Sequence, residues 1–451
     1  MSSSLNVWMN GSLVGEWSIL RSGTSVLRYS RGWIESPYAR ALSLSLPITS
    51  DGEVRGPVVE NYFENLLPDS IEIRRRIRTQ FATPTMSAFD LLTEVGRDCV
   101  GAVQLLPPET VAMGWDRVDG IPLSETQVGQ LLRNITAPAL GRRDDDTEDF
   151  RISIAGAQEK TALLSMGGKW YRPQGATPTT HILKLPLGLI GGMRADFSDS
   201  VENEWLCAQL LRELGLPVAT TAMGNFDGQK ALIVSRFDRH WVGTEAGAVI
   251  KRRFKPPAGA WIARLPQEDF CQAAGLPPSQ KYEADGGPSV ADALALLAGS
   301  EAADHDKAVF VLTQLAFWLL AATDGHAKNF SLHQSSGGHY RMTPLYDVLS
   351  AWPIIGPGAS QIARQKTKLA MSLRGTRKHY KLDEINTRHW QGLAQRSGVI
   401  NLWERMIDFT ESADAALQRV ERKLPDAFPE RVFTKIASGV RGQVKRLLAT
   451  T

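Results

Sequence analysis

Cysteine is scarce in this chain: there are three in 451 residues, far apart, and no two form a C-x-x-C pair. That scarcity excludes a disulfide framework and a zinc ribbon, which need cysteines at short, regular spacings. No apolar run approaches the roughly 18 residues that a membrane-spanning helix needs, and the first residues lack the basic and apolar regions of a secretory signal. These absences predict a cytoplasmic protein with reduced thiols and no membrane partner.

A strong charge excess is also missing, since 51 Lys and Arg face 48 Asp and Glu for a net charge of +3. This balance neither requires nor excludes a nucleic-acid partner, so local clusters must decide. Basic residues gather at Arg74–Arg78, at Lys251–Lys255 and at seven positions between 364 and 381. A solvated surface is the usual explanation of such runs, and the third is the best candidate for a nucleic-acid surface.

Changes in composition and periodicity along the chain predict four segments: 1–110, 111–150, 151–240 and 241–451. The first is expected to be an N-terminal α+β subdomain and the second a connecting segment. Asn10-Gly11 between two short strands predicts a β-hairpin, and the alternation over 41–46 predicts a half-buried strand. Residues 151–240 alternate strand and turn patterns. In 241–451 apolar residues recur at helical spacing, over 290–297, 308–322, 390–410 and 411–423.

The most informative stretch follows an apolar run, 311–320, that predicts a buried helix. Asp324 and Asn329 come next, with four residues between them. In protein kinases an Asp at this spacing accepts the proton of the substrate hydroxyl and the Asn binds magnesium. Asp347, 18 residues beyond Asn329, is a second candidate magnesium ligand. Taken alone, the spacing is equally compatible with a polar turn that caps a core helix.

Two segments that could bind a nucleotide lie before Asp324 in the sequence. The small-residue turn over 155–160 lacks the Walker A pattern, so a plain β-turn and a phosphate-binding loop both remain open. Lys184 interrupts an apolar strand, where a lysine is costly unless it is paired, and a snorkelling lysine is the alternative. Its predicted partner is Glu204 in the following helix, preferred narrowly over Glu202.

In this order the segments resemble the HipA family, the serine/threonine kinase toxins of bacterial toxin–antitoxin modules. The resemblance rests on residues 153–164, 322–331 and 343–347, together with 265–269 and 281–288. It implies an α+β fold of the two-lobed, phosphatidylinositol-kinase-like type. The N-terminal subdomain would abut a nucleotide-binding lobe over 151–240, and an all-helical C-terminal lobe over 241–451 would carry the catalytic loop.

The resemblance also implies roles for individual residues. Asp324 matches the catalytic base, and Asn329 and Asp347 match the magnesium ligands. The residues matched to the nucleotide's phosphates are Ala155, Gly156, Ala157, Gln158, Glu159, Lys160 and Lys184. The hinge positions and the neighbours of nucleotide or metal are Ser235, Arg236, Phe237, His326, Ala327, Lys328 and Tyr346. Ser153 matches a regulatory serine that is autophosphorylated, and the added charge of about −1.5 to −2 would repel the nucleotide and expel the loop.

The implied activity is Mg-ATP-dependent phosphorylation of a protein serine, with ATP and Mg2+ as cofactors. The implied substrates are aminoacyl-tRNA synthetases, notably the glutamyl enzyme, so that translation and growth stop and cells persist. The implied partner is a small helix-turn-helix antitoxin of the HipB type, bound with the kinase on operator DNA. Three departures stand out: the basic insertion around Lys251–Lys255 is longer than in the family, Ser235 replaces an acidic hinge residue, and 374–398 does not align with the family's DNA-contacting positions. The alternatives are a nucleotide-binding corepressor scaffold and a lipid or small-molecule kinase.

Overall fold

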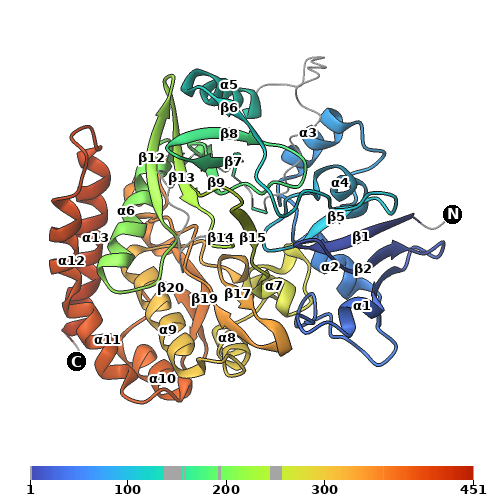
Figure 1. Cartoon of the computed structure of the whole chain (residues 1–451). Helices are drawn as coiled ribbons and strands as arrows, with labels where there is room; N and C mark the ends of the chain where they lie inside the picture. Colours follow the sequence, from blue (N-terminus) through green and yellow to red (C-terminus); the bar gives the residue numbers. More distant parts are fainter. Residues whose placement is uncertain are drawn as a thin grey trace. The chain divides into compact units, whose positions relative to one another are not determined.

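The computed structural model describes residues 3–136, 155–156, 158–190, 195–243, 256–358 and 360–449. The chain divides into two compact units. Figure 1 labels the helices and strands of both. Unit 1 comprises Met1–Leu185, Gly224–Pro278 and Leu332–His339, and unit 2 comprises Pro186–Met223, Ser279–Ser331 and Tyr340–Thr451. This grouping differs from the expected segments, because unit 1 combines the N-terminal subdomain with most of the strands that follow it, whereas the helix near residue 205 belongs to unit 2.

The N-terminal part of unit 1 is built on a five-stranded sheet in the order β4-β3-β2-β1-β5. Its strands are β1 (Ser3–Met9), β2 (Ser12–Ile19), β3 (Ser25–Tyr29), β4 (Glu53–Arg55) and β5 (Gln104–Leu106). The predicted hairpin is confirmed between β1 and β2. Asn10 and Gly11 both take positive φ angles, 45° and 78°, as a tight turn that matches strand twist requires.

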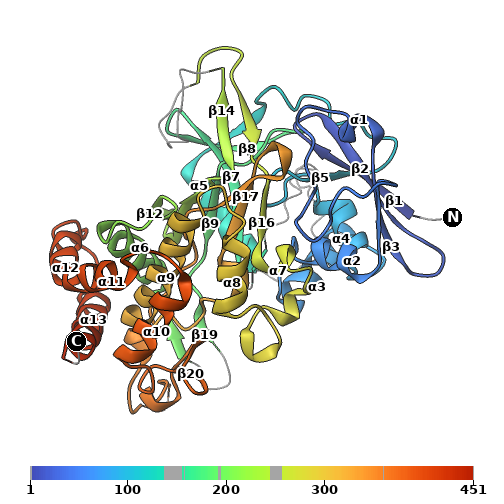
Figure 2. The same ribbon diagram turned by 90° about the horizontal axis from the view of Figure 1, so that it is seen from below.

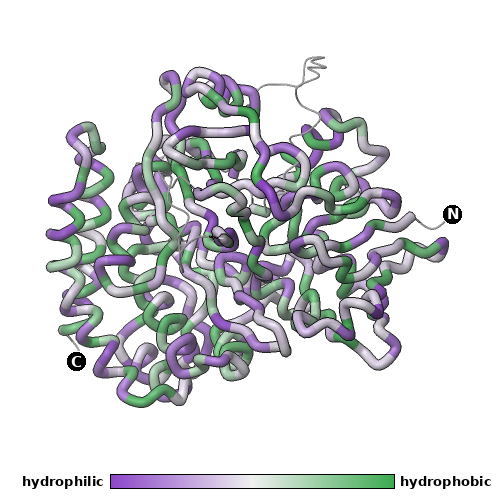
Figure 3. Tube along the Cα trace, viewed as in Figure 1, coloured by the Kyte–Doolittle hydropathy of each residue, from purple (hydrophilic) through white to green (hydrophobic). Residues whose placement is uncertain are grey.

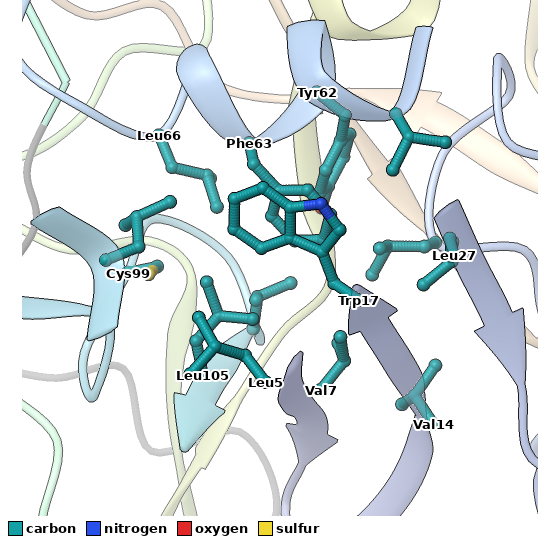
Figure 4. Close-up of a cluster of buried hydrophobic side chains, with 14 of the residues drawn as sticks. Leu5, Val7, Val14, Trp17, Leu27, Tyr62, Phe63, Leu66, Cys99 and Leu105 are labelled. Carbon is teal, nitrogen blue, oxygen red and sulfur yellow. The ribbon is translucent and has the colours of Figure 1, made fainter. Parts of the chain in front are cut away.

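Helices pack on this sheet and enclose an apolar core. They are α1 (Arg31–Ile34), α2 (Pro57–Glu64), α3 (Ile71–Phe81) and α4 (Ala88–Val95), and the expected break at Pro68 separates α2 from α3. Trp17 of β2 stacks on Phe63 of α2, with ring centroids 3.9 Å apart (Figure 4). Cys99 lies in the same core, and all three cysteines are buried and form no disulfide. Burial raises the pKa of the Cys99 thiol to about 12.

The prediction of a strand over 41–46 was wrong. Only an isolated bridge joins Ser43 and Leu46, and the backbone between them turns. The turn is held from a distant segment: the Glu268 carboxylate accepts hydrogen bonds from the Ser43 hydroxyl and from the Leu44 amide, the latter at 3.0 Å. A buried carboxylate therefore replaces the neighbouring strand as the partner of this backbone, which alternation of apolar residues could not reveal.

Glu268 makes the stability of the protein depend on pH. Burial raises its pKa to about 7 from an ordinary 4.5, against the hydrogen bonds from Ser43, Leu44 and Gln334. A raised carboxyl pKa favours folding below about pH 4.5, and this contribution is lost as pH rises to about 7. The side chain in Glu268→Gln cannot ionise. As pH rises from 4.5 to 7 we therefore expect the free energy of unfolding of this variant, measured in urea, to increase by about 3 kcal/mol relative to that of wild type. A difference that is constant from pH 4.5 to 7 would contradict this.

A second sheet has six strands in the order β12-β13-β9-β7-β8-β6, and all of its residues belong to unit 1 except the first three of β12, which belong to unit 2. Its strands are β6 (Gly120–Leu123), β7 (Lys160–Met166), β8 (Lys169–Pro173), β9 (His181–Lys184), β12 (Thr221–Phe226) and β13 (Gln229–Ser235). Helix α5 (Glu125–Thr136) packs on it, and Val128 and Leu132 join Leu163 and Ile233 in a common core. Unit 1 also contains β14 (Arg239–Val242), β15 (Trp261–Arg264), β16 (Gln267–Asp269), α7 (Phe270–Ala273) and most of β17 (Ser331–Gln334).

Unit 2 is mainly helical. Its helices are α6 (Ser200–Glu213), α8 (Val290–Leu297), α9 (Ala303–Leu320), α10 (Thr387–Ser397), α11 (Leu402–Glu411), α12 (Ala413–Glu421) and α13 (Glu430–Leu448). Buried α9 contacts α10 and α13 (Figure 2). Hydrophilic and hydrophobic residues alternate along α12 and α13, as is typical of helices with one buried face (Figure 3). Among the described residues, no helix is long and apolar enough to cross a bilayer.

The prediction that 241–451 is all helical is wrong, because this part of the chain also contains strands. Residues 241–451 include the hairpin of β19 (Lys368–Arg374) and β20 (Lys378–Lys381) and the short strand β18 (Tyr340–Met342), besides β15, β16 and β17. Unit 2 also contains the short strands β10 (Gly188–Ile190) and β11 (Ala195–Phe197), which precede this part of the chain. The period-two pattern that predicts a half-buried strand is missing from β19, because its five central residues are all buried and its basic residues, Lys368 and Arg374, stand only at its ends. The four segments predicted to be helical are helical, and 390–410 is divided at Gly398, whose φ is 70°.

Candidate functional site

The catalytic loop predicted at 324–329 follows directly from the end of α9. Ala321 takes a left-handed conformation, φ 49°, which ends the helix and turns the chain. Gly325 then passes so close to Phe317 that a Cβ on it would lie 2.3 Å from that ring. The side chain of Asp324 is left 64% exposed. A carboxylate at the end of a rigid buried helix, open to solvent, is suited to accept a proton from a substrate hydroxyl.

The same loop is joined to the segment that contains Asp347. Residues 327–329 form a 3-10 turn, and the Asn329 Nδ2 donates to the backbone carbonyl of Asp347 at 3.3 Å. The Tyr346 hydroxyl donates to the carbonyl of Lys328 at 2.8 Å. Asp347 itself has a positive φ of 61°, unusual for a residue other than glycine and typical of functional positions. Residues 18 apart in sequence are thus adjacent in unit 2.

The side chains here fit magnesium. The Oδ1 atom of Asn329 is buried and has no hydrogen-bond partner among the described residues, although the opposite end of its amide is engaged. An amide oxygen held in this way needs a cation or a donor. The described residues contain no group of three or more His, Cys, Asp or Glu that could hold a metal. A site with few protein ligands is typical of Mg2+, which retains waters and substrate phosphate oxygens.

The segment expected to bind phosphates lies in unit 1. Gly156 has a φ of 105°, and a Cβ on it would lie 2.6 Å from the Nζ of Lys160. Lys160 and Lys184 are opposite each other on the antiparallel strands β7 and β9, so both side chains leave the same face of the sheet. Two ammonium groups on one face, next to a glycine that admits no side chain, fit an anionic ligand such as a polyphosphate.

The N-terminal subdomain holds this loop. The amide of Asp69 donates to the carbonyl of Gly156 at 3.2 Å, and Arg76 of α3 forms an ion pair with the Glu159 carboxylate. The Gln158 side chain donates to the carbonyl of Leu185 at 2.5 Å. Glu159 therefore has a structural partner, and part of the Arg74–Arg78 run acts within the fold rather than as a solvated face.

The hinge positions end strand β13 and are anchored by a buried ionic cluster. Asp98 accepts from Thr179 and from three arginines, with contacts of 3.2 Å to Arg236, 2.9 Å to Arg239 and 3.1 Å to Arg264. Burial would raise the pKa of Asp98, but the three guanidinium groups hold it well below its usual range. The side chain of Arg236 is held in this cluster, and its amide donates to the carbonyl of Thr180 at 2.9 Å, so its expected contact with a nucleotide stays a prediction.

The remaining predicted residues are placed as follows. Ser153, Ala157 and the Lys251–Lys255 run lie outside the described residues. Glu204 and Glu202 are both buried in α6 of unit 2, whereas Lys184 belongs to unit 1, so their pairing stays a prediction. The partly buried Ser235 and Phe237 flank Arg236, and Ala155 precedes Gly156. Within the predicted catalytic loop His326, Ala327 and Lys328 are buried.

Sequence reasoning missed Tyr282. Its hydroxyl donates a hydrogen bond to Asp324 Oδ1, and its ring meets that of His326 edge to face at 4.9 Å. Tyr282 lies within 281–288, a segment that carried the family resemblance but received no role. Its place among those motifs was the available indication, since 42 residues separate it from Asp324.

Comparison with known proteins gives concordant matches. Residues 152–428 match the family model of the HipA-like C-terminal domain, and 5–106 match that of the HipA N-terminal domain. The chain is 33% identical over 431 residues to Y4mE of Sinorhizobium fredii, which is provisionally named a kinase, covering 94% of this chain and 92% of the relative. It is 26% identical over 370 residues to the serine/threonine-protein kinase toxin HipA of Shewanella oneidensis, covering 77% and 75% respectively.

A solved structure supports the fold. HipA of Shewanella oneidensis, in a complex with HipB and its operator DNA, superposes with a TM-score of 0.77 at 21% identity, over 99% of this chain and 97% of that one. The predicted α+β, kinase-like fold class is confirmed by this match.

Proposed function

This chain belongs to the HipA family, and we propose that it is a serine/threonine protein kinase that uses Mg-ATP. The observation that carries the proposal is the hydrogen bond between the Asn329 amide and the Asp347 carbonyl. It joins Asn329, five residues after the exposed Asp324 carboxylate at the D-x4-N position, to the segment of Asp347, and amide and carboxylate oxygens are the kinds of ligand that Mg2+ takes. A plain capping turn requires neither the second segment nor the orphaned amide oxygen of Asn329.

The roles follow from chemistry. Asp324 orients the acceptor hydroxyl and takes its proton, while the acceptor oxygen forms a bond to the γ-phosphorus and the bond to the ADP oxygen breaks. Asn329 and Asp347 would hold Mg2+, which neutralises charge on the phosphates when bound. Lys160, Lys184 and the backbone around Gly156 would bind the phosphates of ATP. Catalysis then consists mainly of positioning and electrostatic stabilisation.

A direct test uses the full chain with γ-labelled ATP and Mg2+. We expect label on purified glutamyl-tRNA synthetase and on the chain's own Ser153. Asp347→Asn removes the carboxylate from the proposed metal site, so transfer should fall by about 10²-fold or more and need a higher Mg2+ concentration. Asp408→Asn is the matched control, because Asp408 is an exposed carboxylate of unit 2 on α11. A variant at 347 with wild-type transfer and Mg2+ dependence would refute the metal assignment.

We propose further that the kinase is the toxin of a toxin–antitoxin pair and acts in the cytoplasm. Its partner would be a helix-turn-helix antitoxin of the HipB type, through which it reaches operator DNA. The support is the family and the complex in which the Shewanella oneidensis protein was solved. Expression of the chain alone should arrest growth, and coexpression of the neighbouring antitoxin should restore it. Nucleotide binding without any transfer would instead favour the corepressor scaffold, and transfer to a lipid or small molecule the third alternative.

A further inference from the structure

We propose that Tyr282 is a positioning residue for the catalytic base: its phenol holds the Asp324 carboxylate in the orientation that accepts the substrate proton. The proposal rests on the function proposed above, because it assigns a partner to Asp324. Its starting point is the hydrogen bond that the Tyr282 hydroxyl donates to Asp324 Oδ1. With Oδ1 engaged in this way, Oδ2 is assigned to the acceptor hydroxyl.

The phenol is fixed relative to the catalytic loop. The Ala327 amide donates to the carbonyl of Lys281 at 3.1 Å, which ties the residue before Tyr282 to the residue after His326. The His326 ring packs edge to face against the phenol, and its Nε2 lies 3.9 Å from the same Asp324 oxygen. Backbone and ring contacts together hold Tyr282 on Asp324 from two sides.

The segment around Tyr282 is itself rigid. The Tyr282 carbonyl accepts from the amides of Asp285 and Gly287, at 3.0 and 2.9 Å. A Cβ on Gly287 would lie 2.1 Å from the carbonyl oxygen of Gln280, so only glycine permits this closure. These backbone hydrogen bonds and the close approach at Gly287 favour a permanent positioning role over a gate.

The next residue anchors the segment to the hairpin. The buried Glu283 carboxylate accepts from the Ser372 amide at 2.6 Å and from its hydroxyl at 2.9 Å. Lys378 of β20 adds an ion pair at 2.9 Å. The hairpin β19–β20, absent from the sequence prediction, thus supports the catalytic base through Glu283 and Tyr282.

The test compares Tyr282→Phe with wild type in steady-state transfer to glutamyl-tRNA synthetase. We expect kcat to fall about 10-fold, the scale of one charge-assisted hydrogen bond, with the KM for ATP within about twofold of wild type. Active sites are counted by the stoichiometry of nucleotide binding, so that loss of folded protein cannot mimic the effect. Tyr340→Phe is the control, because it removes another phenol of unit 2, one that donates to the Leu296 carbonyl at 2.7 Å.

A double-mutant cycle separates positioning from a general structural role. In an Asp324→Asn background Tyr282→Phe should cause no further loss, whereas independent structural damage would add. Glu283→Gln, which loosens the anchor without touching the phenol, should lower kcat in the same direction. An unchanged or increased kcat in Tyr282→Phe would overturn the proposal, and so would additivity in the cycle. If the wild-type chain shows no transfer at all, the proposed function fails as well.

Discussion

Asp324→Asn is expected to reduce phosphoryl transfer by about 10² to 10⁴-fold while nucleotide binding stays at the wild-type level. The amide has the shape of the carboxylate but cannot accept the hydroxyl proton. Because Asp324 is exposed at the end of α9, its replacement leaves no buried charge unpaired and should not lower the stability of the protein. Single-turnover transfer from γ-labelled ATP measures the first expectation, and calorimetric titration with nucleotide measures the second.

Asp426→Asn provides the matched control, since it neutralises an exposed carboxylate of unit 2 between α12 and α13. It should transfer phosphate at the wild-type rate. In cells the same contrast should hold: expression of wild type or Asp426→Asn arrests growth, and expression of Asp324→Asn does not. Growth arrest by Asp324→Asn at wild-type levels would mean that toxicity comes from binding and not from catalysis.

The largest expected effect on stability is that of Asp98→Asn. The change leaves Arg236, Arg239 and Arg264 buried with one carboxylate, that of Asp238, in place of two. Removing one partner from a buried ionic group costs about 3–5 kcal/mol, because the remaining charges stay desolvated and uncompensated. A loss of this size is a large part of the free energy of unfolding of an ordinary domain. Urea denaturation at pH 7 measures it.

The pH dependence of this effect has a defined sign. The pKa of Asp98 is held low in the folded protein, so its contribution is present above the ordinary carboxyl pKa and is lost in strong acid. The control is Asp116→Asn, an exposed carboxylate of unit 1, which should change the unfolding free energy by less than about 0.5 kcal/mol. A loss below about 1 kcal/mol in Asp98→Asn would show that the cluster contributes little to stability.

Local patterns were enough for many of the elements. The Asn10-Gly11 turn depends on positive φ angles at its two residues. The break between α2 and α3 depends on Pro68, which has no backbone N–H, and the helix before Asp324 depends on its apolar periodicity. Such preferences act over a few residues and can therefore be predicted from the sequence alone. The D-x4-N spacing likewise lies within a single loop.

Contacts between distant segments could not be predicted from the sequence. The alternation over 41–46 predicted a strand, yet Glu268, more than 200 residues away, turns that backbone. Arg236 was expected at the nucleotide, and Asp98 draws its side chain into a buried cluster. Tyr282 reaches Asp324 across 42 residues that contain two helices. In each case the partner is chosen by how the core packs, and sequence spacing carries no record of that choice.

By itself, then, the sequence determined the order of the segments expected of a kinase and the candidate acid, amide and lysine groups, because each is defined by neighbours along the chain. Only the tertiary structure decided that the Asn329 amide meets the Asp347 backbone and that the Tyr282 hydroxyl meets the Asp324 carboxylate. The physical reason is that a buried polar group must find a hydrogen-bond partner wherever the packed core supplies one.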